Sequence, residues 1–269
     1  MALQLEFEKK PKLFLWFMDS LLMIKRSSTH IIRNTDQLLG TFFQPIMFLV
    51  LFAAVFGGAI SQALPPGVSY LNFLMAGIIV QTVAFGSTTT AIAVSNDLQK
   101  GIVDRFRSLP MANLAVLNGH VISDLFRNGI STVVMILAGL VIGFRTSADV
   151  LDWLIIAGLI LLFTLAFSWL SAIAGVVAKS IEGVQWLSFI VVFPLTFASS
   201  AFVPTEGMNS VLKVFAENQP ITHIVEAIRA LMLGTPLGNH LWISIIWCVA
   251  ILVVSMIVAS WLFRRKTSH

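Results

Sequence analysis

Charged residues are scarce in this sequence. Asp, Glu, Lys and Arg make up only 11% of its 269 residues, while 57% are hydrophobic and the mean hydropathy is +0.90. Soluble domains carry roughly 25% charged residues, so this composition argues against a water-soluble fold and for a chain whose solvent is the lipid bilayer. Strand-like alternation of polar and apolar residues is also missing, which argues against a membrane β-barrel.

Motifs of catalysis are missing as well. The single cysteine, Cys248, excludes an internal disulfide, and the absence of any Gly-Lys dipeptide excludes a phosphate-binding loop ending in Gly-Lys-Ser/Thr. No Gly-x-Ser-x-Gly or His-Glu-x-x-His motif occurs, and the five histidines are scattered: His30, His120, His223, His240 and His269. We therefore predict no catalytic, cofactor-binding or metal-binding residues, and an intramembrane enzyme is disfavoured.

Long apolar runs dominate what is present. Six of them are long enough, at about 1.5 Å per helical residue, to cross a hydrocarbon core of about 30 Å. They are Leu38–Ile60, Tyr70–Val94, His120–Phe144, Leu154–Ala178, Val184–Val203 and Leu241–Phe263. The predicted fold class is an all-α polytopic membrane protein with six transmembrane helices, and the even number places both termini on one side.

The distribution of Lys and Arg indicates which side that is. Positive residues accumulate on the cytoplasmic side of membrane proteins. The two termini and the even-numbered connections hold thirteen, namely Lys9, Lys10, Lys12, Lys25, Arg26, Arg33, Lys100, Arg105, Arg107, Lys179, Arg264, Arg265 and Lys266. The opposite side holds only Arg145, Lys213 and Arg229. Both termini are predicted to be cytoplasmic, and the net charge of +4 reflects this orientation rather than binding to nucleic acid.

The N-terminal region carries a further apolar piece, Leu13–Ile24, which is too short to span. Asp19 interrupts it, and Lys25 and Arg26 follow it where a signal peptide would have a small-residue cleavage site. One face of it is apolar, so we expect a helix lying along the cytoplasmic membrane surface. The predicted organisation is a cytoplasmic segment (1–37), one membrane domain (38–263) and a short cytoplasmic tail (264–269).

A polar stretch, Ser95–Pro110, lies between the second and third apolar runs. Leu98, Ile102 and Phe106 recur every four residues, which predicts a short amphipathic helix that Pro110 ends. Such a helix offers a soluble protein a place to grip the membrane domain. The charged residues on its remaining surface are Asp97, Lys100, Asp104, Arg105 and Arg107.

The outer connection, Pro204–His240, is long and partly apolar. We expect a helix over Thr222–Leu233, capped by Thr222 and stopped by Gly234, and a shorter helix before it, marked by Met208, Leu212 and Phe215. These pieces are too apolar for a solvated loop and too short to cross, so we place them in or on the outer leaflet. A gating lid and an amphipathic surface hairpin without a gating role remain equally open.

Polar residues inside the predicted spans are candidates for function. Asp124 and Arg127 lie three residues apart near the cytoplasmic start of the third span, where we expect them to pair, to reach the lipid headgroups and to serve a structural role. The candidates for a translocation path are Gln44, Phe48, Phe52, Gln81, Ser87, Thr88, Gln185 and Phe193. Hydrogen bonding between helices and packing against lipid are the alternative uses of such side chains.

Three segments resemble the type-2 ABC exporter permeases, and within them the daunorubicin/doxorubicin-resistance permease group. They are GIVDRFRSLPM (Gly101–Met111), SDLFRNGIS (Ser123–Ser131) and FVPTEGMNSVLKVFAENQPITHIVEAIRALMLG (Phe202–Gly234). The resemblance extends over essentially the whole chain, including the six-span order and the helix at its start.

The resemblance implies a permease of the cell membrane that pairs with a second, identical copy. It also implies two copies of a separate cytoplasmic ATPase, which uses ATP and Mg while this chain binds no cofactor. By carry-over, Asn96–Ser108 is the coupling helix, and the outer re-entrant helices hold Phe215, Glu226 and Arg229. The path lies between the two permease copies, flanked mainly by the first, second and fifth spans.

The leading hypothesis is therefore the membrane subunit of an ATP-driven exporter of amphipathic or hydrophobic small molecules, such as a drug or antibiotic. Export of a lipid-linked saccharide, cell-wall polymer or lipooligosaccharide by the same fold is the nearest alternative. Tyr70 is the only tyrosine, which weakly disfavours a sugar channel lined with aromatic residues. An ion-coupled secondary transporter and a structural scaffold protein are less favoured, because no repeat, broken span or midplane ionisable group is evident.

Overall fold

A computed structural model describes residues 35–65, 67–101 and 115–267. These residues are almost entirely helical, and no strand occurs among them. The predicted surface helix Leu13–Ile24 lies outside the described residues. The α-helices of the described residues are α2 (Thr35–Ile60), α3 (Tyr70–Gly86), α4 (Thr88–Gln99), α6 (Ala115–Ile142), α7 (Val150–Val177), α8 (Ile181–Phe197), α9 (Ser210–Asn218), α10 (Pro220–Leu233) and α11 (His240–Thr267).

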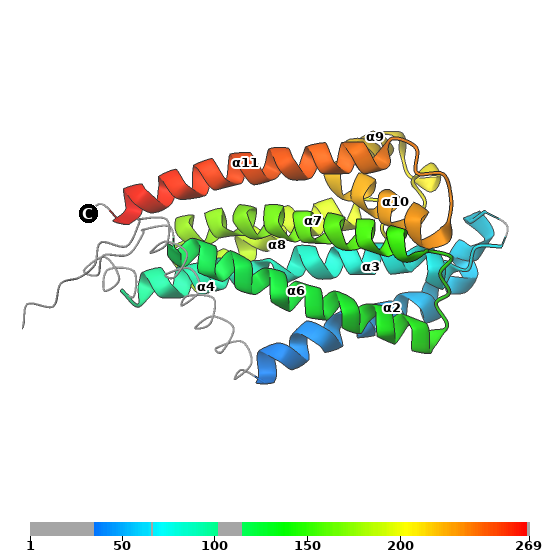
Figure 1. Ribbon diagram of the computed structural model, residues 1–269, viewed down its shortest axis with the longest axis horizontal. Coiled ribbons are helices and arrows are strands. Elements are labelled where there is room, and N and C mark those ends of the chain that lie inside the picture. The colour runs from blue at the N-terminus through cyan, green and yellow to red at the C-terminus, as the bar shows by residue number, and fades with distance from the viewer. Residues whose placement is uncertain (1–34, 66, 102–114, 268–269) are drawn as a thin grey trace, which may run out of the picture.

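The helices form an elongated bundle with two unlike ends. Figure 1 shows the long helices running side by side, with α9, α10 and the connection between α2 and α3 at one end and the C-terminus at the other. Short single-turn helices, Ser61–Ala63 and Thr205–Gly207, also lie in the connections. We call the end that holds α10 the α10 end and the opposite one the C-terminal end.

Five helical segments are long and apolar enough to cross a membrane, and the all-α polytopic class is confirmed. They are Phe43–Ala63, Tyr70–Gln99, Val116–Ile142, Val150–Val177 and His240–Lys266. The fifth predicted span is shorter than expected, because α8 has 17 residues and ends at Phe197. At 1.5 Å per residue it extends about 25 Å. Beyond it the chain turns, and the Gln219 side-chain amide donates to the carbonyl of Leu195 over 2.9 Å.

The second span contains a break between α3 and α4. Ser87 closes the first helix and opens the second, yet the chain continues in the same direction through Gln99. Residues 95–99, which were expected to begin a separate amphipathic helix, are therefore the last turns of this span. Asp97 was expected on a solvated surface, and this is wrong: the residue is buried, with His120 Nε2 2.9 Å from its carboxylate.

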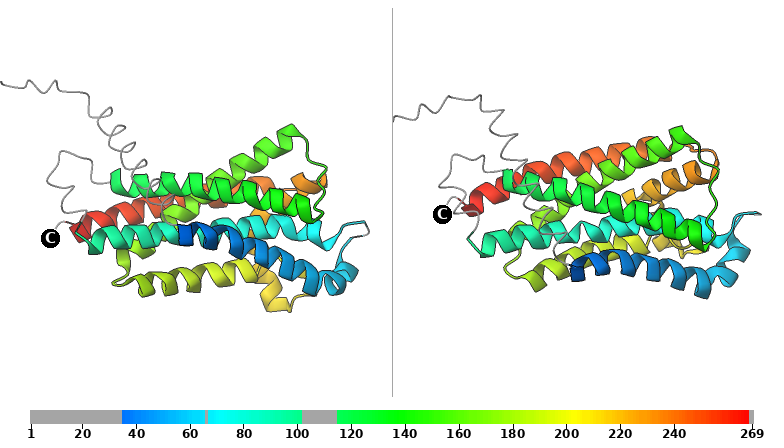
Figure 2. Two further views of the ribbon diagram at one scale, coloured as in Figure 1. Left: turned by 90° about the horizontal axis from the view of Figure 1, so that it is seen from below. Right: turned by 60° about the horizontal axis from the view of Figure 1, so that its bottom comes forward.

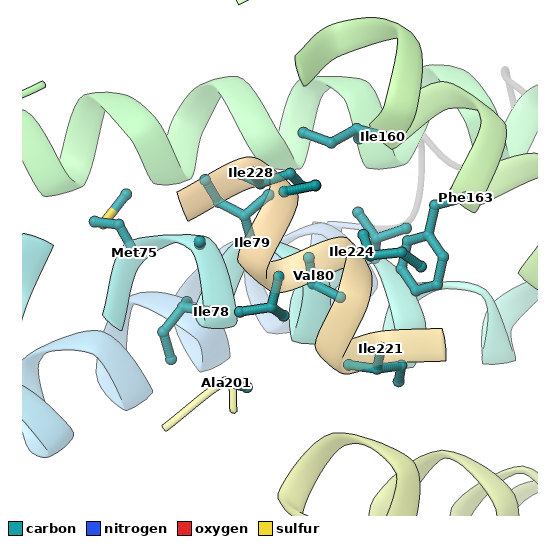
Figure 3. Close-up of a cluster of buried hydrophobic side chains, with 14 of the residues drawn as sticks. Met75, Ile78, Ile79, Val80, Ile160, Phe163, Ala201, Ile221, Ile224 and Ile228 are labelled. Carbon is teal, nitrogen blue, oxygen red and sulfur yellow. The ribbon is translucent and has the colours of Figure 1, made fainter. Parts of the chain in front are cut away.

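Helix α10 is largely apolar and buried at the α10 end, and we call it the plug for this position alone. Its isoleucines, Ile221, Ile224 and Ile228, are fully buried against α3 and α7, as Figure 3 shows. The connection that follows α8 also approaches α3 closely, because Gly77 on α3 has no side chain: a Cβ there would lie 2.0 Å from the carbonyl oxygen of Ala201. This connection is thus packed against α3 at backbone distance.

The ends of α10 are determined by local chemistry. Gln219 is the N-cap, its side chain accepting from the backbone N–H of Ile221 over 3.1 Å, and Pro220 occupies the first turn, where no N–H is needed. Thr222 was expected as the cap. Its hydroxyl instead accepts hydrogen bonds from the Gln219 side-chain amide and from the backbone N–H of Ser200. Gly234 ends the helix at φ 66°, a left-handed conformation that favours glycine, as the sequence predicted.

Candidate functional site

A row of aromatic side chains runs along one face of α2. Phe48, Phe52 and Phe56 recur every four residues, which places them on the same side of the helix. Their neighbouring ring centroids are 5.9 Å and 5.3 Å apart. Gln44, one turn earlier in the same register, is exposed.

A second row follows α8 with the same spacing. Phe189, Phe193 and Phe197 stack with centroid distances of 4.7 Å and 4.4 Å. Gln185 begins this row, so each row starts with an exposed amide and continues with phenylalanines. Figure 2 (right) shows α2 and α8 along the same side of the bundle.

The two rows meet at Phe202, in the connection that follows α8. Its ring centroid lies 4.9 Å from that of Phe52 and 4.9 Å from that of Phe197. The Tyr70 hydroxyl fixes this position by donating to the carbonyl of Phe202 over 3.0 Å. We call the seven rings the phenylalanine ladder: Phe48, Phe52, Phe56, Phe189, Phe193, Phe197 and Phe202.

The ladder is an apolar surface that the single chain leaves partly uncovered. Phe56, Phe189 and Phe193 are each about 40% exposed. Stacked rings favour flat or apolar molecules, since a ring face gives both buried area and specific contact geometry. A surface of this kind can guide a hydrophobic molecule along the bundle axis without binding it through charges.

The ladder unites only part of the predicted path. Phe48, Phe52 and Phe193 belong to it, and Gln44 and Gln185 lie in the same rows. The other three candidates are elsewhere: Gln81 is buried within α3, and Ser87 and Thr88 lie at the helix break.

Four ladder members, Phe56, Phe189, Phe197 and Phe202, were not among the eight path candidates. The spacing of four residues from Gln185 to Phe197 was a signal that could have identified Phe189. Nothing in the sequence pattern indicates Phe202, which lies outside both helices and joins them only through tertiary contact.

A polar cluster surrounds the break between α3 and α4. The Arg127 guanidinium on α6 forms a short ion pair with Asp124 and donates to the carbonyl of Gly86 at the end of α3. Asp124 also accepts a hydrogen bond from Ser168 on α7. The predicted pair therefore exists, and it ties α6 and α7 to the broken span.

The expectation that this pair reaches the lipid headgroups is wrong. Asp124 is 2% exposed and Arg127 is 5% exposed, so protein encloses both. Two ions without water are stabilised only if they are paired and further hydrogen-bonded, which is what Gly86 and Ser168 provide. The hydroxyls of Ser87 and Ser171 at the break are also buried and form a hydrogen bond, with their oxygen atoms 3.0 Å apart.

Several buried polar atoms of this region have no hydrogen-bond partner among the described residues. Both side-chain polar atoms of Asn128 are in this state, as are the hydroxyls of Thr90 and Thr132. Asn128 is also the residue that requires glycine at position 86, since a Cβ there would lie 2.2 Å from its Oδ1. The cluster is therefore only partly satisfied.

The predicted coupling residues divide at the edge of the described structure. Asp97 and Leu98 lie in the last turns of α4, and Leu98 packs against buried apolar side chains of neighbouring helices. Ile102, Asp104, Arg105, Phe106 and Arg107 fall within 102–114, outside the described residues. What the structure shows is that the span leading into this segment is tied to α6 through Asp97 and His120.

At the α10 end the predicted residues take different roles. Arg229 is buried and donates to the carbonyls of Phe73 (3.1 Å) and Ser200 (2.7 Å), while Glu226 pairs with it at 2.5 Å. The guanidinium also lies 3.6 Å from the centre of the Phe73 ring. Phe215, by contrast, is exposed on α9. Arg229 thus anchors α10 to α3, whereas Phe215 faces outward.

These features define a multi-pass α-helical membrane protein with an apolar aromatic surface, an anchored plug and a broken second span. The family described as ABC-2 type transporter matches residues 19–233, and the chain belongs to this family. It is the family of the permease subunits of ABC transporters, in agreement with the resemblance found in the sequence.

Three relatives show the range of the family. The chain is 32% identical over 236 residues to the daunorubicin resistance ABC transporter permease protein DrrB1 of Streptomyces coeruleorubidus, covering 87% of this chain and 81% of that one. It is 24% identical to the probable doxorubicin resistance ABC transporter permease protein DrrC of Mycobacterium tuberculosis, covering 95% and 91%. It is 26% identical to nodulation protein J of Rhizobium meliloti, covering 85% and 86%.

Proposed function

We propose that this permease exports hydrophobic or amphipathic small molecules, of the drug or antibiotic kind, from the cell by ATP-driven transport. The phenylalanine ladder carries the proposal, because it offers seven rings in contact and begins each row with an uncharged amide. Similarity to permeases named for daunorubicin and doxorubicin resistance supports the same cargo class.

ATP hydrolysis belongs, in this proposal, to a separate cytoplasmic ATPase that binds ATP and Mg in two copies. The family implies such a partner, and the sequence lacks a phosphate-binding loop of its own. The segment 95–108 is the contact for that ATPase, and both termini face it on the cytoplasmic side of the cell membrane.

A second, identical permease copy completes the path. Membership of the ABC-2 type transporter family supports this step, and the partly exposed ladder is the surface that we assign to the second copy. The path then lies between two ladders, with α2 and α8 of each copy as its walls.

The direct test is transport by the permease and its ATPase in proteoliposomes, with daunorubicin fluorescence as the readout. Phe52→Ala combined with Phe193→Ala removes a ring from each row, and ATP-dependent transport should fall about tenfold, which corresponds to ~1.4 kcal/mol in the barrier. Phe126→Ala is the matched control, since Phe126 is 62% exposed on α6 and outside the ladder. Unchanged transport, or an equal loss in the control, contradicts the proposal.

The partner is tested separately by co-purification. Phe106→Asp with Arg107→Glu should abolish association with the ATPase, because the apolar stripe and the positive charge of the segment are both lost. Lys10→Glu is the control for a change of charge on the same side of the membrane. If the ATPase remains bound to the first variant, the assignment of this segment is wrong.

A further inference from the structure

We infer that a groove between α7 and α8 binds the exported molecule before it reaches the ladder, taking up one slim apolar chain or ring that carries a hydrogen-bonding oxygen or nitrogen. The inference rests on the proposed function for the identity of the ligand. The groove has a volume of about 230 Å³. Its walls include Phe167, Ala174 and Val177 of α7 and Leu187, Ser188 and Val191 of α8.

The lining of the groove selects against charge. All of its residues are apolar except two serines, and none is ionisable. Leu187 and Val191 at its edge are each more than 40% exposed, so the groove opens onto the flank of the bundle. In a membrane-spanning chain that flank faces hydrocarbon, from which an apolar molecule can enter without crossing water.

One wall group lacks a partner. The Ser188 hydroxyl is buried, lines the groove and has no hydrogen-bond partner among the described residues. A buried hydroxyl without a partner is unfavourable, because it has lost its hydrogen bonds to water. A ligand with a hydroxyl, carbonyl or amine group would satisfy it, whereas a pure hydrocarbon would not. This hydroxyl is the reason for assigning an amphiphile rather than a plain alkyl chain.

The position of the groove suits the uptake step of an exporter. It is lined by the last turns of α7 and the middle of α8, on either side of the connection that holds Lys179. Lys266 near the C-terminus donates to the carbonyl of Val176, so the groove is at the C-terminal end of the bundle. This is the end rich in Lys and Arg that we place in the cytoplasm, where cargo dissolved in the inner leaflet is available.

A hydrogen bond joins the groove to the broken span. Ser171 lines the groove, and its hydroxyl lies 3.0 Å from that of Ser87 at the break between α3 and α4. A ligand that moves this wall therefore acts on the helix that leads to the coupling segment. Binding of a ligand in the groove can therefore change the position of the helix that leads to the proposed ATPase contact.

The probe for the test is 3-azioctanol, an eight-carbon alcohol with a photoreactive diazirine, and the protein is the purified full chain in nanodiscs without ATP or ATPase. We expect saturable labelling of α7 and α8 that excess octanol prevents. Val191→Trp, which fills the groove, should reduce labelling at least tenfold. Val254→Trp on α11 is the matched control, because Val254 is likewise exposed and does not line the groove.

Ser188→Ala provides a variant that does not perturb packing. Loss of one hydrogen bond should weaken binding of the alcohol about threefold to tenfold. It should leave labelling by a diazirine-bearing alkane without a hydroxyl unchanged. Equal effects on both probes would overturn the role assigned to the hydroxyl.

Three results would overturn the inference. The first is labelling that does not saturate. The second is labelling of the groove by a diazirine phosphatidylcholine that octanol does not displace, which would make it a lipid site. The third is unchanged export by Val191→Trp. The proposed function fails in a different way, since it predicts ATP-dependent transport by the complex with its ATPase. Labelling without transport would refute the function and leave an amphiphile site in place.

Discussion

Buried polar groups are stabilised differently at the α10 end and at the break in the second span. At the α10 end, the guanidinium of Arg229 has two carbonyl acceptors, a carboxylate and an aromatic face. At the break in the second span, Arg127 has an acceptor and a carboxylate, but its Nε and the side chain of the neighbouring Asn128 have no hydrogen-bond partner within the described part of the chain. The first end is built as a fixed anchor, while the second keeps polar groups that another arrangement of the helices could satisfy.

This difference agrees with the helix movements that the proposed ATP-driven transport requires. A half-satisfied polar network is costly in one packing, so it lowers the difference in free energy between that packing and another. The α3–α4 break leads into the segment proposed to contact the ATPase, whereas α10 lies at the far end of the bundle. At the break, substitutions should therefore change stability in either direction, according to whether they remove a paired or an unpaired polar group.

The largest expected effect comes from breaking the ion pair. Arg127→Leu leaves Asp124 buried without its counter-ion and should lower the free energy of unfolding by about 3–5 kcal/mol. Equilibrium unfolding in mixed micelles measures it. Replacing both residues by Leu is the control, and it should restore most of the loss because no uncompensated charge remains. A double variant as unstable as the single one would contradict this account.

The α10 end should be sensitive to volume instead. Gly77→Ala forces a Cβ to 2.0 Å from the backbone of Ala201 and should cost about 1–3 kcal/mol. Gly158→Ala on α7 meets nothing within 4 Å and should be neutral or stabilising by less than about 1 kcal/mol. The same unfolding measurement compares the two. Equal behaviour would show that the connection after α8 is not packed against α3 at backbone distance.

At the break, one substitution should stabilise the protein. Asn128→Leu replaces an amide without partners by an apolar side chain of similar size, and the free energy of unfolding should rise by about 1–2 kcal/mol. Transport should fall at the same time if the amide serves a second packing. Ser131→Ala is the comparison, since Ser131 on the same helix already bonds the carbonyl of Arg127. A fall in stability of Asn128→Leu would show that the amide is satisfied.

The smallest expected effect concerns pH at the α10 end. Burial lowers the pKa of His223 from its ordinary value of 6.5, and the nearby His240 lowers it further while Glu226 opposes the shift. The unfolded chain then binds a proton first as pH falls below about 6.5, so this part of the stability is present above that pH and is lost below it. The melting temperature in detergent should fall between pH 7 and 5.5.

The variant that identifies the group is His223→Gln. It should flatten this part of the pH profile. If the slope persists in His223→Gln, another group causes it.

Much of the α10 end could be predicted from local sequence. The apolar stripe of Ile224 and Ile228 and the stop at Gly234 indicated α10 without any tertiary information. The N-cap was misassigned to Thr222, because Gln219 caps the helix only through a side chain that also reaches back to the end of α8. The early end of α8 was missed for the same reason.

The sequence by itself determined the solvent and the class of fold, since apolar runs of this length can satisfy their backbone groups in lipid only as helices. It also paired Asp124 with Arg127, because three residues on a helix bring side chains together wherever the helix lies. Only the tertiary structure decided that this pair is buried, that two phenylalanine rows meet at Phe202, and that Ser171 and Ser87 join the groove to the broken span. These contacts depend on how each helix is rotated and placed against its neighbours, and periodicity within one helix carries no information about that placement.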